Sequence, residues 1–167
     1  MTTSPPQMLT GRCLCGSVRF KLRQPFRPVT VCHCRQCAQW TGHLVATTSV
    51  PLDRFEITSG AEYIGWYSAS EIARRGFCRT CGSALFWKPN DEERISIAAG
   101  SLDPPTGLAV ARHIFVDDKS DYYEIAAEAP CYPQDSPPAG ADADSLRDER
   151  SKLFRQIRTV EPAAVVR

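Results

Sequence analysis

The cysteines are the residues of this chain whose type and spacing could do chemistry. Seven of the eight fall into three short clusters, at residues 13–15, 32–37 and 78–81. The first and third clusters are close copies, because the last cysteine of each is followed by Gly-Ser and then by a run that ends in Phe. The middle cluster, Cys-His-Cys-Arg-Gln-Cys, lacks this exit. Cysteines at such short spacings are typical zinc ligands, so the clusters predict metal sites.

The two matched clusters predict one closed metal site. Together they supply four thiolates, the number that a tetrahedral structural zinc site requires. The glycine after each pair suits the backbone conformations of a tight metal-binding turn. A metal held by two turns so far apart in sequence would close a long loop and contribute free energy to folding. The predicted ligands of this structural zinc are Cys13, Cys15, Cys78 and Cys81.

The middle cluster predicts a different kind of site. Cys32, Cys34 and Cys37 supply three thiolates from one short loop, which leaves zinc one further coordination position. In an open site, the zinc would lower the pKa of an external thiol and act as a Lewis acid, so these cysteines are the predicted catalytic residues. The alternative is a closed site with a fourth protein ligand, for which the candidates are His33, His43, His113 and Cys131.

Composition and charge argue against several classes of function. The net charge is +1 and the pI is about 7.6, so we expect no strong electrostatic interface with nucleic acid or a membrane. No run approaches the roughly 18 apolar residues of a membrane span. Residues 1–10 lack the apolar stretch of a secretory signal, so we expect a cytoplasmic protein with reduced thiols. That location favours zinc over disulfide bonds, and the Cys-x-Cys pair does not match common iron–sulfur spacings.

The elements that must position the cysteines are predicted to be β-strands. Alternating and β-branched runs, separated by turns rich in Pro, Gly, Asn and Asp, are typical of a compact antiparallel all-β domain. They do not alternate with helices, which argues against a βαβ fold. The predicted strands are residues 17–22, 44–50, 55–58, 84–87, 95–98 and 113–116.

The remainder of the chain is predicted to be a C-terminal extension. A proline-rich stretch precedes a segment in which Leu146, Leu153 and Ile157 repeat on one face, as in an amphipathic helix. The predicted organisation is a disordered lead-in at 1–10, a zinc-binding domain at 11–128, a linker at 129–144, a helix at 145–160 and a tail at 161–167.

The combined pattern resembles the glutathione-dependent formaldehyde-activating enzyme family, which includes centromere protein V. The resemblance covers about residues 11–125 and is carried, in matching order, by residues 11–18, 32–37, 76–83 and 113–116. It implies a β-tent-like all-β fold with one structural zinc and one more labile, catalytic-type zinc at the middle cluster. It also implies a carbon–sulfur lyase that forms or splits S-(hydroxymethyl)glutathione. The chain departs from the family pattern at Tyr122-Tyr123, in a region that often holds Trp.

Two functional hypotheses follow from these observations. In the first, the chain is a lyase with two zinc ions that binds a small-molecule thiol such as glutathione, and Arg75 holds a carboxylate of that thiol. The competing interpretation of Arg74 and Arg75 is a solvated pair of charges. In the second hypothesis, the chain is a non-enzymatic zinc scaffold that binds a protein partner. The sequence leaves open whether the chain forms a homo-oligomer.

Overall fold

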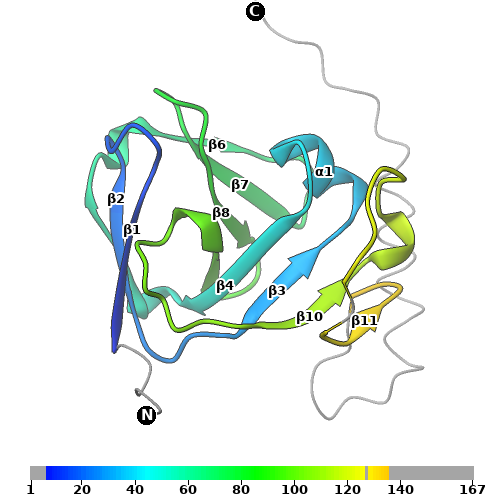
Figure 1. Ribbon diagram of the computed structural model, residues 1–167. Helices are drawn as coiled ribbons and strands as arrows, with labels where there is room; N and C mark the ends of the chain where they lie inside the picture. Colours follow the sequence, from blue (N-terminus) through cyan, green and yellow to red (C-terminus); the bar gives the residue numbers. More distant parts are fainter. Residues whose placement is uncertain (1–6, 127, 136–167) are drawn as a thin grey trace, which may run out of the picture. The chain divides into compact units, whose positions relative to one another are not determined.

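In the computed structural model (Figure 1), the described part of the chain forms two β-sheets and one short α-helix. The structure describes residues 7–126 and 128–135. The predicted all-β class is therefore confirmed. Within the described residues, no helix has the length and apolar character needed to cross a membrane.

The smaller sheet has three antiparallel strands in the order β1-β2-β5, with bounds Met8–Arg12, Arg19–Arg23 and Phe55–Ser59. Side chains in β1 and β2 alternate between buried and exposed, as they do when one face of a sheet covers a core. Leu9, Phe20 and Leu22 point into the core. Strand β1 begins at Met8, so the prediction of disorder is wrong for residues 8–10.

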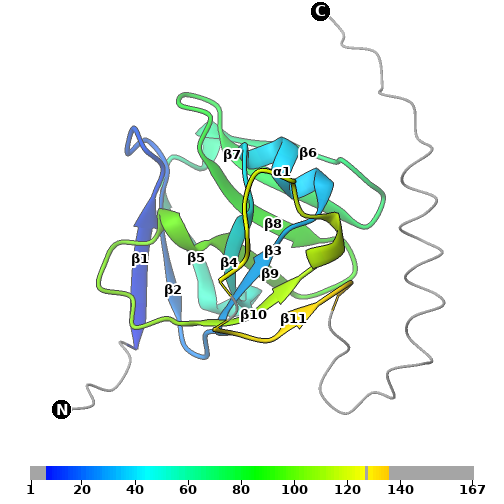
Figure 2. The ribbon, with the colours of Figure 1, turned by 45° about the vertical axis from the view of Figure 1, so that its right-hand side comes forward.

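The larger sheet has eight strands in the order β11-β10-β3-β4-β9-β8-β7-β6 (Figure 2). The pairings from β3 to β6 are antiparallel, as predicted, whereas β10 pairs in parallel with both β3 and β11, so the sheet is mixed at that edge. The strands are β3 Val29–Cys32, β4 Val45–Pro51, β6 Ile64–Tyr67, β7 Ala73–Cys78, β8 Ala84–Pro89, β9 Arg94–Ala98, β10 Val110–Ile114 and β11 Cys131–Tyr132.

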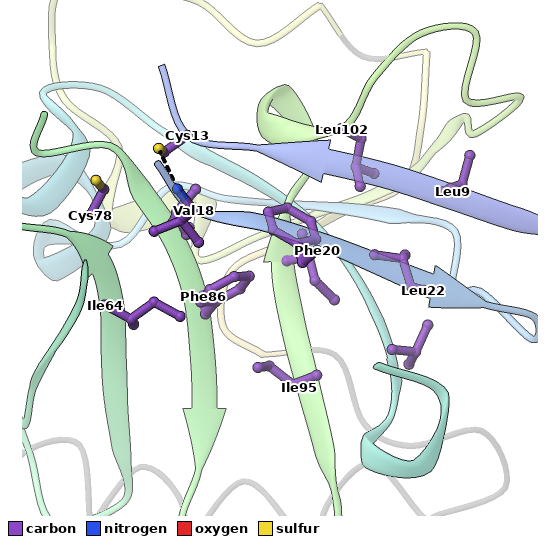
Figure 3. Close-up of a cluster of buried hydrophobic side chains, with 13 residues drawn as sticks. Leu9, Cys13, Val18, Phe20, Leu22, Ile64, Cys78, Phe86, Ile95 and Leu102 are labelled. Atoms are coloured by element: carbon purple, nitrogen blue, oxygen red, sulfur yellow. Dashed lines mark hydrogen bonds between the residues drawn. The ribbon is translucent and has the colours of Figure 1, made fainter. Parts of the chain in front are cut away.

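The core lies where apolar side chains of the two sheets meet (Figure 3). Phe20 of β2 and Phe86 of β8 pack edge to face with ring centroids 5.1 Å apart, and Phe55 of β5 packs on Phe86 at 5.2 Å. Such pairs stabilise a core beyond the area that they bury. Cys13 and Cys78 lie at one end of this cluster, beside Val18 (Figure 3). The sheets therefore bring the two matched cysteine turns together.

Within residues 7–126 and 128–135, helical structure is confined to short segments. Helix α1, Arg35–Thr41, ends at Gly42 in the left-handed conformation. The 3-10 helices are Leu52–Arg54, Ala61–Tyr63, Ala99–Ser101 and Val116–Asp118. Helix α1 was not predicted, because seven residues are too few to show an apolar period.

The C-terminal part of the predicted organisation is only partly described. Strand β11 lies inside the segment 129–144 that was predicted to be a linker, and it pairs with β10. That pairing is long-range and leaves no local signal in so short a strand. The predicted helix at 145–160 and the tail at 161–167 lie outside the described residues.

Candidate metal centres

Two similar turns carry the four matched cysteines. Cys13 and Cys15 lie between β1 and β2, while Cys78 ends β7 and Cys81 follows it in the turn to β8. In each turn the first cysteine donates its backbone N–H to a carbonyl five residues later, at Val18 in one case and Ser83 in the other. The glycine after the second cysteine has a φ of 76° in the first turn and 77° in the second. A side chain would strain this left-handed backbone, which explains glycine at both positions.

The sulfurs of these four cysteines form one compact group. All lie within 4.8 Å of one another, and the Sγ of Cys15 is 3.5 Å from that of Cys13 and 3.8 Å from that of Cys78. In a tetrahedral zinc site with Zn–S bonds of about 2.3 Å, neighbouring sulfurs are about 3.8 Å apart. The group therefore fits a four-coordinate metal such as zinc.

Hydrogen-bond donors surround these sulfurs. The backbone N–H of Val18 donates to Cys13 Sγ at 3.2 Å (dashed in Figure 3), and the Ser83 hydroxyl lies 3.2 Å from Cys81 Sγ. Burial raises the pKa of the Cys13 thiol to about 11, whereas the Ser83 hydroxyl lowers the pKa of the Cys81 thiol to about 5. Because Cys81 already favours a thiolate, a cation that replaces the remaining protons fits this site.

The other three clustered cysteines form a second group. Cys32 ends β3, Cys34 caps α1 in an extended conformation, and Cys37 lies inside the helix. Their sulfurs lie within 4.8 Å of one another, with Cys37 buried and the other two half-buried. The prediction that all three come from one loop is wrong, because strand, cap and helix each supply one sulfur. The helix turns Cys37 back toward the other two.

Hydrogen bonds among these three thiols shift their pKa values in different directions. The hydrogen bond between Cys32 and Cys34 raises the pKa of Cys32 and lowers that of Cys34. Burial raises the pKa of Cys32 further, because the thiolate loses hydration. The group therefore holds fewer than three negative charges by itself, and a bound cation would let all three sulfurs become thiolates.

The described residues bring no fourth ligand to this group. None of the four candidates, His33, His43, His113 and Cys131, has a ligand atom within 4.8 Å of all three sulfurs. Cys131 is exposed in β11, and His33 is turned toward other partners. Within this part of the chain, three sulfurs without a fourth protein ligand are the arrangement that an open metal site requires.

Two tyrosines that were not predicted as site residues contact the histidines beside this group. The Nδ1 of His33 is 2.6 Å from the Tyr123 hydroxyl, and the Nδ1 of His43 is 2.7 Å from the Tyr122 hydroxyl. Burial lowers the pKa of His33 and raises the pKa of Tyr123, so both are neutral near pH 7. The sequence shows the two adjacent tyrosines, but it does not show that they contact His33 and His43, which lie about 80 to 90 positions away.

Arg75 lies beside the three-cysteine group. Its side chain is 5 % exposed, its Nη2 donates to Gln36 Oε1 at 2.9 Å, and its Cζ lies 5.8 Å from the centre of the Trp40 ring. Both partners belong to α1, which also carries Cys37. Arg74, the preceding residue, is exposed and lies over Trp66. The interpretation of the two arginines as a solvated pair is therefore wrong for Arg75.

Sequence comparisons place the chain among known proteins. The family model for the glutathione-dependent formaldehyde-activating enzyme matches residues 8–118. An uncharacterized lyase of Schizosaccharomyces pombe is 29 % identical over 122 residues, which cover 70 % of this chain and 84 % of the relative. A Halomonas elongata protein that carries the name of a glutathione-dependent formaldehyde-activating enzyme is 28 % identical over 156 residues, or 87 % of this chain and 96 % of the relative.

A solved structure is also similar. The crystal structure of a Rhodobacter sphaeroides protein aligns with a TM-score of 0.49 and 24 % identity. The alignment covers 73 % of this chain and 98 % of that one.

Proposed function

Because the chain belongs to the glutathione-dependent formaldehyde-activating enzyme family, we propose that it is a zinc-dependent carbon–sulfur lyase. Its substrates would be thiol–aldehyde adducts such as S-(hydroxymethyl)glutathione. The observation that carries the proposal is the group of three sulfurs without a fourth ligand among the described residues. An enzyme that activates an external thiol needs such a vacant coordination position.

Each chain would hold two zinc ions with different roles. Cys13, Cys15, Cys78 and Cys81 would hold a structural zinc that joins the two matched turns, and Cys32, Cys34 and Cys37 would hold the second. When bound at the three cysteines, zinc supplies a Lewis acid that lowers the pKa of a coordinated thiol.

The proposed reaction balances without an oxidant or reductant. In the direction of synthesis, a carbon–sulfur bond forms between the thiol sulfur and the aldehyde carbon, while the thiol proton ends on the aldehyde oxygen. In the reverse direction the same bond breaks and the proton returns to sulfur. The reaction therefore requires a thiolate and a route for one proton, and no change of oxidation state.

The residues around the three cysteines would orient the reacting groups. The hydrogen bond between Tyr123 and His33 ties the strand end that carries Cys32 to the segment after β10. A fixed geometry of this kind supplies much of the rate of an addition reaction. Arg75 is the proposed substrate-binding residue, because a guanidinium group hydrogen-bonds well to anionic atoms.

The experiment that tests the proposal combines metal content with turnover. We expect the purified protein to hold two zinc ions and to lose one to glutathione with a mild chelator. The variant Cys34→Ser should retain one zinc, remain folded and have no turnover with formaldehyde and glutathione.

Cys131→Ser is the matched control, because Cys131 is exposed and outside both groups. Full turnover in C34S would exclude the proposed role. Two zinc ions that resist chelation, together with no turnover, would favour the zinc scaffold instead.

A further inference from the structure

Arg75 carries a buried charge that forms no ion pair with a carboxylate in the part of the chain that the structure describes. Its side chain is 5 % exposed, and within residues 7–126 and 128–135 no Asp or Glu forms an ion pair with it. Its Nη1 atom is buried and has no hydrogen-bond partner among the described residues. Burying a cation is unfavourable unless an anion compensates for the lost hydration. The position of Arg75 therefore requires a source of negative charge nearby.

The neighbours of Arg75 identify that source. The two contacts given above, Gln36 and Trp40, are both uncharged, and they hold the guanidinium against α1. The groups that can supply negative charge there are the cysteine sulfurs, because Trp40 lies three residues after Cys37 and so neighbours it on the surface of α1. Gln36 directly precedes Cys37, so the contact that orients Arg75 also places it next to the cysteine group.

We propose that Arg75 is the counter-cation of the Cys32–Cys34–Cys37 centre, and that its unpaired Nη1 favours an anionic sulfur as the fourth ligand. Zinc with three thiolates carries one net negative charge, and one guanidinium balances it. When a substrate thiolate binds as the fourth ligand, the centre and Arg75 together again carry one negative charge. The centre with this thiolate is more stable beside the charged guanidinium than it would be without it. This inference rests on the zinc-binding part of the proposed function and deepens it.

The four-cysteine group has other sources of charge compensation, which explains why it has no counterpart of Arg75. Zinc with four thiolates carries two net negative charges, but Cys15 is exposed and Cys81 is half-buried, so water can screen the site. Backbone N–H and serine groups lie beside its sulfurs. In the three-cysteine group no cysteine is exposed, and a buried guanidinium replaces that solvation.

The inference assigns Arg75 a role different from holding a distant carboxylate. Because Arg75 is buried, a group that binds to it must reach it inside the protein. The reacting sulfur has to reach the metal position, whereas a carboxylate elsewhere on the thiol does not. Arg75 therefore selects for the charge of the reacting atom, and acts on both metal retention and thiol binding.

The experiment measures zinc retention in competition with a chelator, using zinc alone as the probe. We expect Arg75→Gln to release its second zinc at a chelator concentration roughly tenfold or more below that of the wild type, because a neighbouring charge is lost. Arg75→Lys keeps the charge and should lie closer to the wild type than R75Q. Arg74→Gln is the matched control and should behave as the wild type, because Arg74 is exposed. The zinc at the four cysteines is the internal reference for folding.

A second variant tests the inference without removing the arginine. Gln36→Glu changes only the charge of the group that already contacts Arg75. A carboxylate there would neutralise Arg75 and add negative charge beside Cys37, so Q36E should also release the second zinc more readily. Equal zinc retention in R75Q, Q36E and the wild type would overturn the inference, whatever the turnover. Equal loss in R75K and R75Q would overturn the role of charge. Absent turnover in a wild type that binds the second zinc as described would instead count against the proposed lyase.

Discussion

The Nε2 of His33 lies 2.9 Å from the Nδ1 of His113, which links the residue directly after Cys32 at the end of β3 to strand β10. The other nitrogen of His33 contacts the Tyr123 hydroxyl at 2.6 Å, so both ring nitrogens of this buried histidine are paired. His33 stands between Cys32 and Cys34 in the chain. The chain of hydrogen bonds therefore fixes the segment that carries two sulfurs of the three-cysteine group.

Removing the Tyr123 hydroxyl should loosen this segment. We expect Tyr123→Phe to lower the free energy of unfolding by roughly 1 to 3 kcal/mol, because the buried Nδ1 of His33 loses its partner. Urea unfolding of the zinc-loaded protein measures the change. Tyr122→Phe is the control and should stay within about 0.5 kcal/mol, since Tyr122 is 62 % exposed. Equal changes in the two variants would contradict the role given to the buried hydrogen bond.

Chelation of the four-cysteine site should unfold the domain. The metal would join the turn after β1 to the turn after β7, and the backbone N–H of Leu14 already donates to Ser83 Oγ across that junction at 3.0 Å. Cys78→Ser should therefore lower the midpoint of thermal unfolding and leave at most one zinc per chain, because metal binding contributes directly to folding. Cys131→Ser should unfold like the wild type. A stable C78S protein with a single zinc would show that the three-cysteine group holds its metal independently.

The cysteine pattern predicted the metal groups well, because the residues themselves carry the information. The spacing indicated which cysteines pair, and the structure confirms two groups that could hold metal ions. Gly16 and Gly82 both adopt positive φ, as their position after a ligand pair indicated. That the metals are zinc, and that the second is catalytic, stays a prediction.

Other features of the site depend on long-range contacts that a single sequence does not show. Nothing in the pair Arg74-Arg75 reveals which side chain points inward, because that depends on the register of β7 between β6 and β8. Helix α1 is too short for a period, yet it supplies the contacts of Arg75. Strand β11 exists only through its pairing with β10.

The aromatic contact between the sheets should dominate the stability of the core. Phe86 is 1 % exposed and packs against Phe20 and Phe55 of the smaller sheet. We expect Phe86→Ala to lower the free energy of unfolding by about 3 to 5 kcal/mol, because it removes buried area and leaves a cavity. Tyr67→Ala, at a position 60 % exposed, should change it by less than about 0.5 kcal/mol. Chemical denaturation measures both, and a small loss in F86A would mean that the two sheets contribute independently.

Gly60 is the glycine whose replacement should disturb the four-cysteine site from a distance. Its φ is 75°, and a Cβ there would collide with the backbone carbonyl of Ser17, which lies in the turn that carries Cys13 and Cys15. Gly42 has a φ of 82°, and a Cβ added there would have no atom within 4 Å. Replacing Gly42 with Ala therefore measures the free-energy cost of the left-handed backbone alone. We expect Gly42→Ala to cost about 1 kcal/mol, as a strained backbone does. Gly60→Ala should cost more and should also lower zinc retention at the four cysteines, measured by chelator competition. Equal losses in the two variants would show that backbone strain alone, and not the contact with Ser17, accounts for the effect.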